Sequence, residues 1–158
     1  MPKPRKKSLR EVLIGKVAER MVVIIEEPPV IAETKKELKD SRVAFITTAG
    51  VHVKSDPPFN TKGDHTFRII PGDADRADLT ITHDHYDTSE AMKDMNCVFP
   101  LEILQNLAEE GFIKEVAPRH FGFMGYIPES DRLIKETAPM LADMLVADGV
   151  DIALLSPG

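Results

Sequence analysis

The sequence has a single cysteine, no tryptophan, and no apolar run that approaches the roughly 20 residues of a membrane-spanning helix. A lone cysteine excludes an internal disulfide, which agrees with a reducing compartment. The N-terminus has basic residues but lacks the apolar segment of a secretory signal peptide. We therefore expect a soluble, cytoplasmic protein without a membrane partner.

Positive charge is also scarce, because 20 Lys and Arg face 26 Asp and Glu, for a net charge of -6. A general nucleic-acid binder needs an excess of basic residues to neutralise phosphates, so nucleic acid is not an expected partner. The 158 residues suffice for one domain with a sizeable core. We expect an α/β domain over residues 41–158, incomplete at its C-terminus, behind a basic tail and helical extension over residues 1–40.

Apolar spacing and turn residues place the elements of this domain. A run at 43–47 predicts a buried central strand, and 66–72 and 78–82 predict two short strands. Helices are expected over 8–21, 100–111 and 129–149, the last despite Pro139, and residues 150–158 predict a buried final strand. Short strands separated by helices favour a three-layer fold with a mainly parallel sheet flanked by helices, Rossmann-like or flavodoxin-like.

Parallel sheets bind ligands beyond the carboxyl ends of their strands. We therefore expect the long loop after Thr48, the segment 83–87 and Gly158 to converge around one cleft. The long loop is the first candidate for a functional segment, because loops of this length are usually functional or mobile.

The motif His83-x-His85-x-Asp87 follows a predicted strand and admits more than one interpretation. Alternation along an extended backbone points both imidazoles the same way, so they could hold a divalent ion as in metallohydrolases. Against this, metallo-β-lactamases continue with a histidine where this chain has Thr88, and no cluster completes a metal shell. Alternatively, these side chains cap the backbone where strand becomes loop.

Two further candidates are weaker. Cys97 precedes a helix and is interpreted as a small buried hydrophobe rather than a nucleophile. Arg119 and His120 either bind an anion or line the end of the sheet. The residues alone leave open a metal-dependent hydrolase using His83, His85 and Asp87, and a non-catalytic binding domain.

Several motifs, in their order, resemble the glycine/sarcosine/betaine reductase selenoprotein B family, which is related to the D-proline reductase selenoprotein subunit. The resemblance covers residues 41–158. It is carried by "VAFITTAGVHVKSDPPF", "GDHTFRIIPGD", "LTITHDHYD", "NCVFPLEILQNLAEEGFI", "PRHFGFMGYIP" and "DGVDIALLSPG".

The resemblance implies that the last strand leads into a selenocysteine or cysteine motif, whose selenol or thiol attacks the substrate as a C–N bond is cleaved. The chain holds no cofactor of its own, and the reactive residue is expected after Gly158, beyond a UGA codon read as a stop or in a segment that a degenerate relative has lost. The former is preferred. Implied partners are other reductase subunits, a thiol or selenol electron donor, and glycine, sarcosine, betaine or D-proline; a homo-oligomer is left open. The implied substrate-binding or supporting residues are His52, Asp64, His65, His83, His85, Asp87, Arg119 and His120.

Overall fold

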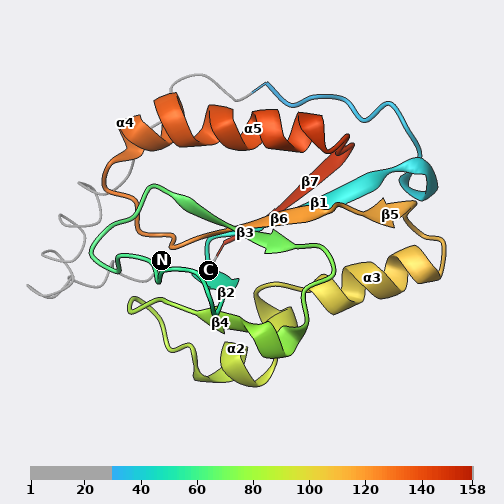
Figure 1. The fold of residues 1–158 in the computed structure, drawn as a ribbon. Coiled ribbons are helices and arrows are strands. Elements are labelled where there is room, and N and C mark those ends of the chain that lie inside the picture. Colours follow the sequence, from blue (N-terminus) through green and yellow to red (C-terminus); the bar gives the residue numbers. More distant parts are fainter. Residues whose placement is uncertain (1–29, 158) are drawn as a thin grey trace, which may run out of the picture. The chain divides into compact units, whose positions relative to one another are not determined.

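The computed structural model describes residues 30–157 of a chain that divides into two compact units, residues 1–32 and 33–158. The helix expected at 8–21 and the basic tail lie outside the described residues. The larger unit has α/β architecture with a five-stranded sheet and a separate two-stranded sheet (Figure 1). The α/β class is confirmed, whereas the boundary at residue 41 stays a prediction.

Strand β1 (Arg42–Thr47) is the central strand of the larger sheet, as expected. It runs parallel to β7 (Ile152–Ser156) along its length, to β5 (Glu115–Val116) at its beginning and to β6 (Arg119–Phe123) at its end. Since β5 and β6 pair with opposite ends of β1, they share the side that β7 does not use.

The remaining pairings are antiparallel. Strand β3 (Phe67–Pro71) pairs with β6, and β2 (Val51–Val53) pairs with β4 (Leu79–Ile81). The mainly parallel, Rossmann-like sheet is therefore not confirmed: the sheet is mixed, because the connection from β1 to β3 returns the chain in the opposite direction. The described residues before α3 (Leu101–Glu109) also form short helical elements, namely η1 (Leu38–Asp40), η2 (Arg76–Asp78), α2 (Ser89–Lys93) and η3 (Met95–Cys97).

Alternation along β1 buries its side chains on both faces of the sheet. Phe45 packs in a cluster with residues of α3 (Leu101–Glu109), and its ring meets Phe99 edge to face at 5.6 Å. Ile46 packs on the other face with Leu141 of α5 (Ala138–Ala147). Helices α3 and α5 accordingly lie on opposite sides of the sheet (Figure 1).

Both helices expected in this domain are confirmed. Helix α3 ends before Gly111, which adopts a φ of 76°. The second helical region consists of α4 (Ser130–Arg132), a π-helical turn η4 (Leu133–Thr137) and α5. Pro139 lies in the first turn of α5, where its missing amide hydrogen interrupts the regular helical bonding least.

The expectation of a buried final strand is wrong. Leu154 is 41% exposed and Leu155 is 74% exposed. The reason is that, among the described strands, β7 pairs only with β1 and is an edge strand. Leu155 lines an apolar cavity of about 230 Å³ whose other walls come from Ile46, Thr48, Phe123, Ile127, Leu133, Ala138 and Leu141.

Candidate functional site at the carboxyl edge of the sheet

The turn that follows β1 is tied to the ends of three other strands. The Thr48 amide donates to the carbonyl of Ser156 at the end of β7 (3.1 Å), and the Gly50 amide donates to the carbonyl of Phe123 at the end of β6 (2.7 Å). The Thr82 amide, just after β4, donates to the carbonyl of Gly50 (2.8 Å). The segments after β1 and β4 therefore lie together beside the end of β7, while Gly158 is outside the described residues.

Two glycines permit this close approach. A Cβ atom on Gly50, whose φ is 76°, would lie 2.3 Å from the carbonyl oxygen of Thr82. A Cβ atom on Gly125, whose φ is 94°, would lie 2.5 Å from the carbonyl oxygen of Thr48 and 3.4 Å from Nε2 of His83. Side chains at these positions would therefore separate the segments that form the edge.

His83 is the sequence-predicted residue most closely associated with this edge. Its Nδ1 accepts a hydrogen bond from the backbone amide of His85 (3.0 Å), and its ring lies 4.5 Å from the ring of Tyr86. Burial, with a smaller contribution from the charge of His85, lowers the pKa of His83 despite the opposing influence of Asp84. His83 is therefore predominantly neutral at pH 7.

Aromatic contacts extend from His83 across the loop. The His85 ring lies 5.6 Å from that of His83 and 4.8 Å from that of Tyr126, which follows β6. The Tyr86 hydroxyl donates to the carbonyl of Ala49 (3.0 Å) and so attaches this loop to the turn after β1. Burial raises the pKa of Tyr86, which keeps the hydroxyl protonated for this bond.

The motif that suggested a metal site is arranged differently from a metal shell. Asp87 accepts a hydrogen bond from the Ser89 amide (3.0 Å) at the beginning of α2, which lowers the pKa of Asp87. Nδ1 of His83 is already bonded to the His85 amide. Within residues 30–157, no group of three or more His, Cys, Asp or Glu side chains is placed to hold a metal ion. The contacts of Asp87 match the backbone-capping interpretation.

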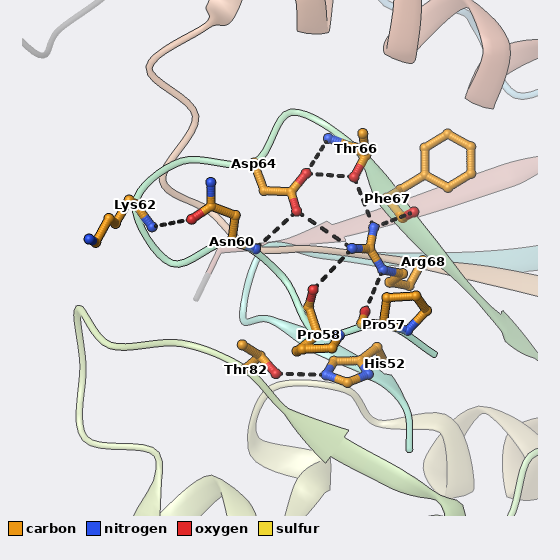
Figure 2. A network of polar contacts seen from close by, with 10 residues as sticks. All are labelled: His52, Pro57, Pro58, Asn60, Lys62, Asp64, Thr66, Phe67, Arg68 and Thr82. Carbon is orange, nitrogen blue, oxygen red and sulfur yellow. Dashed lines mark hydrogen bonds and ion pairs between the residues drawn. The ribbon is translucent and has the colours of Figure 1, made fainter. Parts of the chain in front are cut away.

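Asp64 organises the loop before β3, as Figure 2 shows. Its carboxylate accepts hydrogen bonds from the amides of Asn60 (3.1 Å) and Thr66 (2.9 Å) and faces Arg68 at 3.5 Å. Burial alone would raise the pKa of Asp64, but these hydrogen bonds and the Arg68 charge lower it overall. The neighbouring His65 faces Glu129 at 3.7 Å. These contacts shape the loop and leave Asp64 little capacity to bind a ligand.

His52 is a buried structural residue of β2, only 3% exposed. Its Nδ1 lies 2.8 Å from the carbonyl oxygen of Val53. Its Nε2 lies 2.7 Å from the hydroxyl of Thr82, as Figure 2 shows. The ring also meets Phe59 edge to face at 5.6 Å. Both ring nitrogens are thus engaged within the protein.

His120 and Arg119 are not at the carboxyl edge either. His120 is fully buried beside Phe99, and its Nδ1 accepts a hydrogen bond from the amide of Phe45 (2.8 Å). Burial lowers the pKa of His120 to about 4. Arg119 begins β6 and therefore lies at the amino edge, where its guanidinium binds Asp148 with two hydrogen bonds of 2.8 and 2.7 Å.

The interpretation of Cys97 as a buried hydrophobe is wrong, because the residue is exposed. The turn η3 directs Met95 into the core and leaves Cys97 at the surface. Sequence reasoning also missed Tyr86 and Gly125. Tyr86 stands inside the histidine motif, and Gly125 follows an apolar strand, so both carried a local signal.

Among residues 30–157, no helix is long and apolar enough to cross a membrane. This finding agrees with the absence of long apolar runs in the sequence.

Comparisons with known proteins give the site a chemical context. The sequence profile of the glycine/sarcosine/betaine reductase selenoprotein B family matches residues 22–157. The D-proline reductase subunit gamma of Acetoanaerobium sticklandii is 47% identical over 136 residues, which are 86% of this chain and 56% of that subunit. The sarcosine reductase complex component B subunit beta of Peptoclostridium acidaminophilum is 29% identical over 127 residues, which are 77% of this chain and 29% of that subunit. The chain thus spans about half or less of these relatives, and no solved structure matches it significantly.

Proposed function

Because the chain belongs to the glycine/sarcosine/betaine reductase selenoprotein B family, we propose that it forms part of a reductase component that cleaves a C–N bond of a small amino acid. The observation that carries this proposal is the 47% identity to a D-proline reductase subunit, which extends over 86% of the chain. The lower identity of 29% to a sarcosine reductase subunit makes D-proline the first substrate to test, ahead of sarcosine, glycine and betaine.

The carboxyl edge is where we propose that the substrate binds. The turn after β1, the loop containing His83 and the end of β7 are joined there by backbone hydrogen bonds. Ligands of α/β proteins bind at such strand ends. A redox-active selenocysteine or cysteine, in a polypeptide that extends beyond Gly158, would supply the nucleophile for C–N cleavage.

Regeneration of that nucleophile requires a second thiol, since reduction by a thiol or selenol ends in a bond to another sulfur. The sequence offers Cys97 as its single thiol. We therefore propose that other reductase subunits and a thiol or selenol electron donor act with this chain in the cytoplasm.

The test is to express the gene together with its downstream codons, replacing any selenocysteine by cysteine, and to compare it with the 158-residue form. Products from D-proline, sarcosine, glycine and betaine are measured with a dithiol reductant and candidate partner subunits. The extended form is expected to open the D-proline ring, and Cys97→Ser is expected to leave this activity unchanged. Equal turnover by the short form, abolished in Cys97→Ser, would contradict the proposal.

A further inference from the structure

The hydrogen bond to His83 fixes which of its ring nitrogens can donate. Nδ1 accepts from the His85 amide at 3.0 Å, so it holds a lone pair and not a proton. The neutral ring must therefore carry its proton on Nε2. Because burial disfavours the charged ring, this neutral tautomer is the dominant form at pH 7.

The donor nitrogen faces the edge at which the strands end. A Cβ atom on Gly125 would lie 3.4 Å from Nε2 of His83, so a side chain at position 125 would lie against this nitrogen. The Tyr86 ring lies 4.5 Å from the His83 ring, tilted by 56°, and Tyr86 is anchored by its hydroxyl to the carbonyl of Ala49. The ring is thus held on one side by the Tyr86 ring and at Nδ1 by the backbone.

The charged and titratable groups around His83 are few. Asp84 lies 3.2 Å from Nε2 of His85, and its negative charge also acts on His83, where it opposes the lowering of the pKa by burial and by His85. His85 itself lies 3.1 Å from the carbonyl oxygen of Thr61. Tyr86 remains protonated. A ligand with negative charge therefore meets a neutral hydrogen-bond donor at Nε2 of His83.

We propose that His83 binds the carboxylate of the substrate through its Nε2–H group at the ends of β1 and β6. The inference rests on the proposed function for the choice of an amino acid such as D-proline as ligand. A carboxylate forms a charge-assisted hydrogen bond with such a donor, which is shorter and stronger than a bond between neutral groups. The bound carboxylate would also favour protonation of the ring, so binding should raise the pKa of His83.

The test uses nuclear magnetic resonance of the 158-residue protein with ¹⁵N-labelled histidine. His83 is expected as the Nε2–H tautomer, with signals that shift on addition of D-proline and of cyclopentanecarboxylate. Prolinamide, which keeps the ring and amine but lacks the carboxylate, should cause no shift. Addition of D-proline should also move the titration midpoint of His83 to higher pH.

Variants separate His83 from its neighbour. His83→Asn should weaken D-proline binding in calorimetry at least tenfold, whereas His85→Asn keeps the backbone amide that orients His83 and should change binding less than threefold. If His83→Asn does not fold, the ligand shifts in the unaltered protein still decide the matter. The proposal is overturned if His83 is the Nδ1–H tautomer, or if prolinamide shifts its signals as much as D-proline does.

The same measurements distinguish this inference from the proposed function. A response of His83 to cyclopentanecarboxylate but not to D-proline supports carboxylate binding and contradicts D-proline as the substrate. Conversely, if the extended protein opens the D-proline ring and His83→Asn leaves its KM and pH profile unchanged, carboxylate binding by His83 is wrong while the proposed reductase function stands.

Discussion

The two edges of the main sheet are held together by different interactions. At the amino edge, charged side chains pair with one another: Arg119 binds Asp148 with two hydrogen bonds, and Arg42 lies 3.1 Å from Glu115. At the carboxyl edge, backbone amides and carbonyls join the ends of β1, β6 and β7, and the turn after β1 to the segment after β4. Backbone hydrogen bonds join strands at both edges, but the amino edge adds paired charged side chains to them, whereas the described contacts of the carboxyl edge contain no ion pair between strand ends.

This difference explains why an arginine at one edge is a poorer candidate for ligand binding than a histidine at the other. The Asp148 carboxylate raises the pKa of Arg119 through its hydrogen bonds and charge, and it occupies the guanidinium that would bind an anion. At the carboxyl edge the backbone orients His83 through Nδ1 and leaves Nε2 directed toward Gly125. A polar side chain near a strand end is thus a better candidate for ligand binding when it is not itself used in a structural ion pair.

The largest expected effect comes from Gly122→Ala, which would break the close packing near the carboxyl edge. A Cβ atom at this position would lie 1.9 Å from the carbonyl oxygen of Val51, which is backbone and cannot rotate away. We expect the free energy of unfolding to fall by more than about 4 kcal/mol, measured by urea denaturation.

A matched glycine calibrates this measurement. Gly111 adopts a positive φ of 76°, unlike Gly122, and a Cβ atom there meets nothing within 4 Å. Gly111→Ala should therefore cost only about 1 kcal/mol, the strain of the backbone conformation alone. Equal losses in the two variants would show that contact with Val51 does not limit this part of the sheet.

Between the two edges, His120 should make stability depend on pH. The pKa of His120 is lowered to about 4 in the folded protein from 6.5. The unfolded chain therefore binds more protons between these values, so stability is fully present above pH 6.5 and is lost as the pH falls toward 4. A difference of this size corresponds to about 3 kcal/mol.

The matched variant is His120→Asn, whose amide oxygen can accept the Phe45 amide in place of Nδ1 but does not titrate. Urea denaturation of both proteins between pH 7 and pH 4.5 isolates the contribution of His120 from that of the carboxylates. Parallel pH dependence in the two proteins would refute the assignment.

The smallest expected effect is at the amino edge. Arg119→Gln removes a partly exposed ion pair and should reduce the free energy of unfolding by about 1 kcal/mol, less in 1 M salt. Arg132→Gln, in an exposed pair with Glu136, should cause no measurable loss. Binding of cyclopentanecarboxylate should be the same in both variants as in the unaltered protein; weaker binding in Arg119→Gln alone would remove the distinction between the edges.

Local patterns in the sequence were sufficient for the elements but not for their directions. The apolar run at 43–47 identified β1, and helical spacing after Pro100 identified α3, because both signals depend on neighbouring residues. The antiparallel pairing of β3 with β6 depends instead on how a long connection crosses the fold. Exposure of β7 was likewise unpredictable, since the same apolar run is compatible with a central strand and with an edge strand.

The candidate site shows the same limit. His52 and His83 were expected at one site because both follow predicted strands. His52 instead lies in the three-residue strand β2, within the segment predicted to be a loop, and its ring is buried. Arg119 was expected near the site because its guanidinium could bind an anion and because the family resemblance implied it, but it stands at the beginning of β6 and not at its end. The histidine motif was located correctly at a strand end, although the tautomer of His83 and its ring contact with Tyr86 required the structure.

The pairing of β1 has a consequence for the order in which the protein folds. Its neighbours β5, β6 and β7 all lie far along the chain, after residue 114, so the central strand is synthesised long before any of its hydrogen-bonding partners. Closing such long loops costs entropy before the native contacts can compensate, and topologies of this kind fold slowly. During translation the apolar segment Arg42–Thr47 therefore emerges before its partner strands β5, β6 and β7, and it remains unpaired with them until they have been synthesised.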